Sequence, residues 1–210
     1  MRKRCSTGHI LTAEPAGILA QQVRPAAIEA SSDDALMMRV RARDGVAFRV
    51  LVDRHLAPLH RIAYRMIGDA SEAEDITQEA LLRLWRDADR WQAGMSGTGA
   101  WLNRVVINLC LDRLRKRRFS SDADVPDRAD EAALAPEAMD AVRMRAATVA
   151  AIAALPDRQR AAVVLTYYEE VSNQVAAETM EMNIKAFESL LLRARTALRL
   201  ALCSIKEAAQ

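Results

Sequence analysis

The sequence has few aromatic residues, glycines and prolines, and these shortages favour helices over sheets. Aromatic side chains make up 4% of the 210 residues, which include 7 glycines and 6 prolines. Alanine, leucine and arginine are abundant instead, and they lose little rotamer freedom in a helix. No stretch alternates apolar and polar residues as a half-buried strand does. We therefore expect an all-α protein.

Long apolar runs and disulfide motifs are also missing. No apolar run reaches the roughly 18 residues that a membrane helix needs, so we expect no membrane insertion. The three cysteines, Cys5, Cys110 and Cys203, are far apart, which indicates a reducing, cytoplasmic setting.

Signals for catalysis are weak. His55 and His60 lack the spacing of a zinc site, and the glycines between residues 94 and 99 are not followed by the residues of a phosphate-binding loop. We expect Cys110 to pack in a core rather than attack a substrate. The sequence therefore predicts no enzyme, no metal ion and no cofactor.

The charges are segregated although the net charge is only +2. Residues 104–118 contain six basic residues and one acid, and residues 119–140 contain seven acids and one arginine. The net charge hides this segregation, in which a basic helix is followed by an acidic tether. We predict a disordered leader (1–32), a first helical domain (33–118), a flexible acidic linker (119–137) and a second helical domain (138–205).

Cap residues predict where the helices of the first domain begin. Asp33 or Asp34 can cap the first helix, and Pro58 predicts a kink or break near His55 in the second.

The later helices of this domain also have candidate caps. Ser71 and Glu74 form a capping box, and Thr98 can cap a helix from about Trp101 to Arg118 after a glycine-rich loop.

The stretch from Glu170 to Arg199 predicts a helix-turn-helix, with Ser172 capping the first helix and Asn183 the second. A helical hairpin that packs against a partner is the alternative. The outer face of the second helix offers side chains for base edges and phosphates: Lys185, Ser189, Leu192, Arg193 and Arg195.

The helix from Trp101 to Arg118 is amphipathic and ends in a cluster of basic residues. One or two cations would suffice to stabilise the helix dipole, so the excess indicates phosphate contact. The candidate nucleic-acid residues are Trp101, Asn103, Arg104, Asn108, Arg113, Arg115 and Lys116.

The helix from Ser71 to Trp85 has an acidic and amide face, made of Glu72, Asp75, Gln78, Glu79 and Arg83. Composition alone favours an ordinary solvated face. As a docking face, its candidates are Asp75, Gln78, Glu79 and the neighbouring Leu82.

Three motifs, in order, resemble the extracytoplasmic-function sigma factors, the small bacterial promoter-specificity subunits. They are AEDITQEALLRLW (73–85), AWLNRVVINLCLDRLRKRR (100–118) and ALPDRQRAAVVLTYYEEVSNQVAAETM (154–180). The resemblance covers about residues 33–202. It implies a sigma-2-like helical bundle and a sigma-4-like helix-turn-helix domain.

The resemblance also implies roles for these surfaces. The acidic face would dock on the clamp helices of the largest subunit of core RNA polymerase, and the last domain would meet its flap. The glycine-rich loop and basic helix would bind the −10 promoter element, and the helix-turn-helix would bind the −35 element. An anti-sigma factor is an implied partner.

The chain departs from the family at the helix-turn-helix. Many members carry a basic residue where Glu188 and Leu190 stand, and glycine where Glu181 stands. Two other functions stay open: a helix-turn-helix regulator that acts without core polymerase, and a helical protein-binding adaptor.

Overall fold

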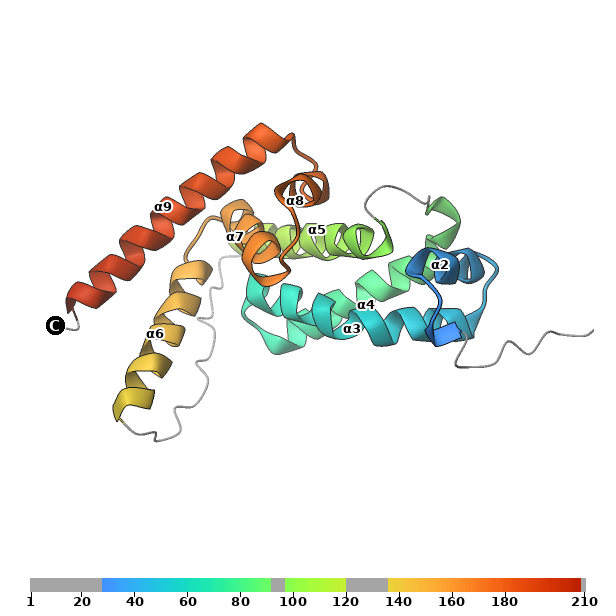
Figure 1. The fold of residues 1–210 in the computed structure, drawn as a ribbon, viewed down its shortest axis with the longest axis horizontal. Coiled ribbons are helices and arrows are strands. Elements are labelled where there is room, and N and C mark those ends of the chain that lie inside the picture. The colour runs from blue at the N-terminus through green and yellow to red at the C-terminus, as the bar shows by residue number, and fades with distance from the viewer. Residues whose placement is uncertain (1–27, 92–96, 120–135, 209–210) are drawn as a thin grey trace, which may run out of the picture.

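The computed structural model describes residues 28–91, 97–119 and 136–208, and within these ranges it contains helices and no strand. The helices form two bundles that contact each other (Figure 1). The prediction of an all-α protein with two helical domains is confirmed.

The first domain is a bundle around one central helix. Its elements are α2 (Asp33–Arg41), α3 (Gly45–Ile67), α4 (Ala70–Arg86), the short 3-10 helix η1 (Ala88–Arg90) and α5 (Gly97–Phe119). α3 packs against α2, α4 and α5. Apolar residues at helical spacing bury themselves along these contacts, where loss of contact with water stabilises the fold. The fully buried side chains include Leu36, Met37, Leu51, Ile62, Leu84 and Ile107.

The cap of α2 differs from the prediction. Ser32 accepts a hydrogen bond from the Ala35 amide at 3.3 Å and is the N-cap. Asp33 and Asp34 lie one and two residues further on, and their carboxylates turn to α3 and α5 instead.

The sequence predicted a kink or a break near His55. α3 continues through Pro58 from Gly45 to Ile67, so the chain does not break there. Proline has no amide hydrogen, which removes one hydrogen bond from the helix. Leu51 and Leu59 are buried on either side of this point, and their packing keeps the helix in one piece. α3 ends at Gly68, whose φ of +78° is readily adopted by glycine.

The caps of α4 and α5 were also predicted wrongly. Asp69, not Ser71, caps α4 by accepting from the Glu72 amide at 2.8 Å. α5 begins at Gly97, so Thr98 lies inside its first turn and is buried.

The second domain contains the predicted helix-turn-helix. Its elements are α6 (Pro136–Ala153), α7 (Asp157–Val163), the π-helix η2 (Val164–Tyr168), α8 (Asn173–Thr179) and α9 (Ile184–Ala208). Ser172 accepts from the Val175 amide and Asn183 from the Ala186 amide, so both predicted caps are confirmed. α9 buries Phe187 and packs against α6, α7 and α8.

The domain limits shift by a few residues. Ile28 is 4% exposed and packs in the core, so residues 28–32 of the expected leader belong to the first domain. α6 begins at Pro136, within the predicted linker. The remainder of the leader (1–27) and of the linker (120–135), and most of the glycine-rich loop (92–96), lie outside the described residues.

Candidate nucleic-acid interface

The outer face of α9 is open to solvent over its whole predicted binding surface. Packing of Phe187, Leu191 and Ala194 against the rest of the domain fixes which side of the helix faces outward. Arg193 folds back to donate to the Ser189 carbonyl at 3.3 Å, and Arg195 donates from Nε to the Tyr167 hydroxyl. All five candidates are exposed: Lys185, Ser189, Leu192, Arg193 and Arg195.

The turn between α8 and α9 contains a residue in the left-handed region. Glu181 has a φ of +52°, a conformation that is uncommon for a residue with a side chain. The Met182 amide donates to the Ala177 carbonyl at 3.0 Å and closes the turn. The turn therefore keeps the helix-turn-helix geometry although glycine is absent.

α5 carries all seven candidates for the second nucleic-acid surface. Asn108, Arg115 and Lys116 are exposed, and the other four, Trp101, Asn103, Arg104 and Arg113, are partly buried. The structure thus distributes the candidates along one helix rather than gathering them at one point.

Two cations of α5 pair with a single carboxylate of α4. Arg113 lies 3.2 Å from Glu72 Oε2, and Arg117 lies 2.5 Å from Glu72 Oε1. The sequence pattern had placed Glu72 on the acidic face of α4, whereas the structure turns it toward α5. Only the packing of α4 on α5 reveals this pairing.

The predicted docking face on α4 is partly as expected. Asp75 and Gln78 are exposed, and Leu82 is 58% exposed. Glu79 differs, because its carboxylate is 2.7 Å from Arg83 Nε and its charge is largely balanced on its own helix. The face therefore presents one unshielded carboxylate, one amide and one apolar side chain.

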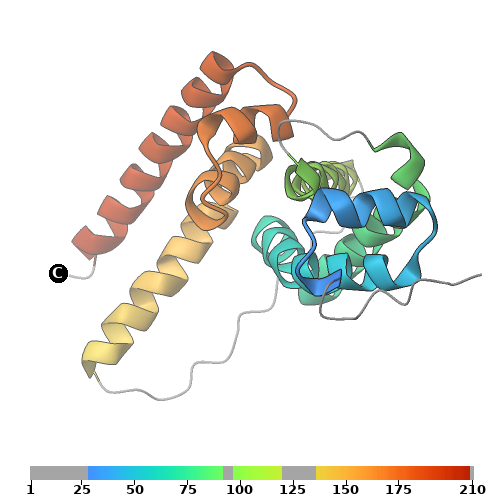
Figure 2. The same cartoon turned by 45° about the vertical axis from the view of Figure 1, so that its right-hand side comes forward.

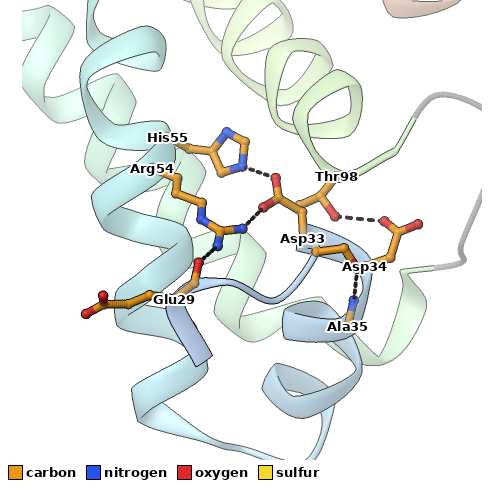
Figure 3. Close-up of polar contacts among 8 residues, drawn as sticks. Glu29, Asp33, Asp34, Ala35, Arg54, His55 and Thr98 are labelled. Carbon is orange, nitrogen blue, oxygen red and sulfur yellow. Dashed lines mark hydrogen bonds and ion pairs between the residues drawn. The ribbon is translucent and has the colours of Figure 1, made fainter. Parts of the chain in front are cut away.

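A polar cluster that the sequence did not indicate joins α2, α3 and α5 (Figure 3). Asp33 lies 2.6 Å from both Arg54 Nη1 and His55 Nε2. Thr98, in the first turn of α5, donates to Asp34 at 3.4 Å. Burial tends to raise the pKa of Asp33, but hydrogen bonds from Arg54 and His55 outweigh it, so this pKa lies below its usual value. The cluster fixes the start of α5, where the candidates Trp101 and Arg104 follow.

The two domains contact each other through α3 and α5 on one side and α7, η2 and α8 on the other (Figure 2). Arg160 of α7 is 9% exposed and donates to the Met66 carbonyl of α3 as well as to carbonyls of its own domain. Arg65 lies 3.4 Å from Glu169 and 4.1 Å above the centre of the Tyr168 ring. Burial raises the pKa of Glu169, although Arg61 and Arg65 oppose the rise.

Metal sites and membrane-spanning helices were two further possibilities for the described residues. They contain no group of three or more histidine, cysteine or acidic side chains that could bind a metal ion. Nor does any helix among them have the length and apolar character needed to cross a membrane.

Two family models match the chain, one in each domain. Sigma-70 region 2 matches residues 51–120 and Sigma-70 region 4 matches residues 145–198. The first range contains α4 and α5, and the second contains α8 and the first part of α9, to residue 198.

Curated relatives are similar over most of their length. The ECF RNA polymerase sigma factor SigL of Mycobacterium tuberculosis is 32% identical over 162 residues, 77% of this chain and 92% of SigL. SigM of the same species is 34% identical over 172 residues, 80% of this chain and 83% of SigM. SigW of Bacillus subtilis is 29% identical over 172 residues, 77% of this chain and 91% of SigW.

Solved structures share the fold. CnrH, determined in complex with the cytosolic domain of CnrY, superposes with a TM-score of 0.63 at 24% identity, covering 83% of this chain and 99% of CnrH. RpoE of Bartonella quintana, determined with the anti-sigma factor NepR, gives a TM-score of 0.59 at 24% identity, covering 74% and 96% of the two chains.

Proposed function

Because this chain belongs to the extracytoplasmic-function RNA polymerase sigma factors, we propose that it binds core polymerase, reads the −10 and −35 promoter elements and promotes promoter melting. The observation that carries the proposal is the pair of surfaces on α5 and α9. They lie in separate domains, and each offers arginines beside polar side chains. Such a pair suits phosphate binding combined with base recognition.

Each surface has a distinct role in this proposal. α9 enters the major groove of the −35 element, where Lys185 and Ser189 reach base edges and Arg193 and Arg195 contact phosphates. Leu192 is exposed on the same face and suits apolar contact with a thymine methyl group.

α5 acts on the −10 element in the same scheme. Trp101 provides a stacking surface for an unstacked base, and Asn103, Arg104 and Asn108 offer hydrogen bonds. The basic end of the helix, with Arg113, Arg115 and Lys116, follows the phosphate backbone. No bond is made or broken by the chain in this scheme, and no cofactor takes part.

Protein partners complete the proposal. Asp75, Gln78 and Leu82 on α4 dock on the clamp helices of the polymerase, with Glu79 as a shielded neighbour. The second domain meets the flap. We infer that an anti-sigma factor controls the chain, by analogy with the complex of RpoE with the anti-sigma factor NepR.

In vitro transcription with bacterial core polymerase and a promoter library tests the function. We expect chain-dependent transcripts, and a loss of at least about tenfold for the Asp75→Ala/Gln78→Ala/Leu82→Ala variant, because about 1.4 kcal/mol of lost binding already gives a factor of ten. Glu29→Ala/Asp53→Ala is the control, since both residues are exposed and neither lies on α4.

One result would contradict the proposed function. A chain that shifts a duplex alone but never binds core polymerase would be a helix-turn-helix regulator, and the sigma factor proposal would fall.

A further inference from the structure

Arg195, one of the proposed phosphate contacts of α9, is held by a side chain from another element. Its Nε donates to the hydroxyl of Tyr167 in η2, 28 residues earlier in the chain. Its guanidinium carbon also lies 5.4 Å from the centre of the Tyr167 ring. The hydroxyl and the ring of one tyrosine therefore contact the same guanidinium.

The fold of η2 fixes the place of this tyrosine. Val164 and Leu165 are buried and anchor the segment, and the Glu169 amide donates to the Val164 carbonyl at 3.2 Å in the hydrogen bond of a π turn. Tyr167 itself is 50% exposed. Because η2 continues α7, and α7 packs against α9, the tyrosine is anchored relative to the helix that carries Arg195.

The contact leaves the phosphate-binding end of Arg195 open. Tyr167 engages only the Nε–H group, so both terminal nitrogens can still donate end-on to phosphate oxygens. A tyrosine hydroxyl also accepts this hydrogen bond without bringing a negative charge. Arg113 differs, because it pairs with the carboxylate of Glu72. Tyr167 therefore holds Arg195 and preserves its positive charge for a ligand.

Arg193 of the same helix shows what a support from outside α9 adds. Its Nε donates to the Ser189 carbonyl at 3.3 Å, one turn back on α9. Arg195 is tied instead to a second element of the domain. An arginine loses rotamer freedom when it binds a phosphate, and a side chain that is already held loses less.

We propose that Tyr167 is a positioning residue for −35 binding, which holds the Arg195 guanidinium with its terminal nitrogens directed at a backbone phosphate beside the major groove. The proposal rests on the proposed −35 role of α9 and adds to it a residue of η2. Without the hydroxyl, Arg195 is still present and charged, but it has more rotamers to give up and binds the phosphate less tightly.

Binding of the polymerase holoenzyme to a fluorescent promoter duplex tests this role. The duplex is a promoter that the wild-type chain transcribes from the library, and the holoenzyme contains the full chain. Tyr167→Phe removes the hydroxyl and keeps the ring, and Tyr167→Ala removes both. Arg195→Ala and the double variant Tyr167→Phe/Arg195→Ala complete a cycle. The control is Tyr168→Phe, at the neighbouring tyrosine, whose ring lies under Arg65 instead.

We expect Tyr167→Phe to weaken promoter binding about threefold and Tyr167→Ala about tenfold, the scale of one hydrogen bond and of that bond with an exposed cation–π contact. Tyr168→Phe should bind like wild type. In the Arg195→Ala background, Tyr167→Phe should have no further effect, because its role acts through the arginine.

Three results would overturn the proposal. The first is equal binding by wild type and Tyr167→Phe. The second is tighter binding by Tyr167→Phe, which would show that the tyrosine withholds Arg195 from DNA. The third is an equal loss with and without Arg195, which would give Tyr167 a role apart from the arginine.

The salt dependence distinguishes positioning from a general effect on the fold. Arg195→Ala removes a phosphate contact and should lower the salt slope by about 1. Tyr167→Phe keeps the charge and should lower the slope by less. Urea denaturation of the free chain is the accompanying control. We expect Tyr167→Phe to unfold at the wild-type midpoint, because the side chain is half exposed.

The wild-type holoenzyme separates this inference from the function on which it rests. Failure of the wild type to bind or transcribe any promoter would refute the sigma factor function and this inference with it. Promoter binding by the wild type without coupling between Tyr167 and Arg195 would refute this inference alone. NMR of the free chain reports the positioning without polymerase: exchange of the Arg195 Nε hydrogen with solvent should be slower in wild type than in Tyr167→Phe.

Discussion

Asp33 and His55 are joined by a contact of 2.6 Å between Oδ2 and Nε2, and the other oxygen of Asp33 binds Arg54. One carboxylate of α2 thus engages two consecutive residues of α3. His55 also lies next to α5, since a Cβ at Gly99 would be 3.6 Å from its ring. The contact therefore orders three helices around the start of the proposed −10 surface.

Replacing this carboxylate should destabilise the first domain. For Asp33→Asn at pH 7 we expect a loss of about 1–2 kcal/mol in the free energy of unfolding, the scale of a partly exposed, charge-assisted hydrogen bond. Urea denaturation measures it, with the exposed Asp53→Asn as control. A loss no greater than that of the control would show that the cluster adds nothing to stability.

The same pair of proteins should show a defined pH dependence. The pKa of Asp33 is lowered in the folded state, so its contribution is complete above the usual value of 3.8 and is lost as the pH falls through the lower folded value. The difference between wild type and Asp33→Asn should therefore be constant near neutrality and shrink below about pH 4. A difference that persists unchanged in strong acid would contradict this assignment.

The two described cysteines should differ sharply in reactivity. Burial raises the pKa of Cys110 to about 12, and the thiolate is the reactive form. Cys203 is exposed on α9. At pH 8 iodoacetamide should modify Cys203 and spare Cys110 in the native chain, and denaturant should expose both, as peptide mass spectrometry can measure. Rapid labelling of native Cys110 would mean that α5 is not packed as described.

Arg193 offers a test of phosphate contact by α9. Arg193→Ala should weaken binding of the polymerase holoenzyme to promoter duplex about equally for all −35 sequences, and lower the salt slope by about 1. The matched control is Arg145→Ala, an exposed arginine of α6 outside the helix-turn-helix. A change in sequence preference instead would assign Arg193 to base recognition.

The sequence predicted what depends on periodicity and local chemistry. The helix-turn-helix, its caps at Ser172 and Asn183, and the burial of Cys110 follow from patterns within a few residues. Competition among neighbouring candidates was harder to resolve: Asp69 caps α4 rather than Ser71, since both lie before the same apolar run. Pro58 does not break α3, because tertiary packing outweighs a local preference.

Contacts between distant segments could not be predicted at all. The sequence gives no sign that Arg160 of α7 differs from the nearby Arg158, yet it is buried and binds a carbonyl 94 residues away in the chain. Glu72 looked like part of an exposed acidic face until the packing of α4 on α5 turned it toward Arg113 and Arg117. The sequence alone does not show which distant residues form hydrogen bonds or ion pairs with such side chains.

The π-helix η2 contains two consecutive tyrosines that serve different neighbours. The hydroxyl of Tyr167 accepts from Arg195 of α9, and the ring of Tyr168 lies under Arg65 of the first domain. A π turn is an α-helix with one inserted residue, and deleting a residue would rotate everything beyond it by about 100°. The length of this segment is therefore more constrained than its composition. Deleting one residue there would turn both tyrosines away from their present partners, Arg195 and Arg65.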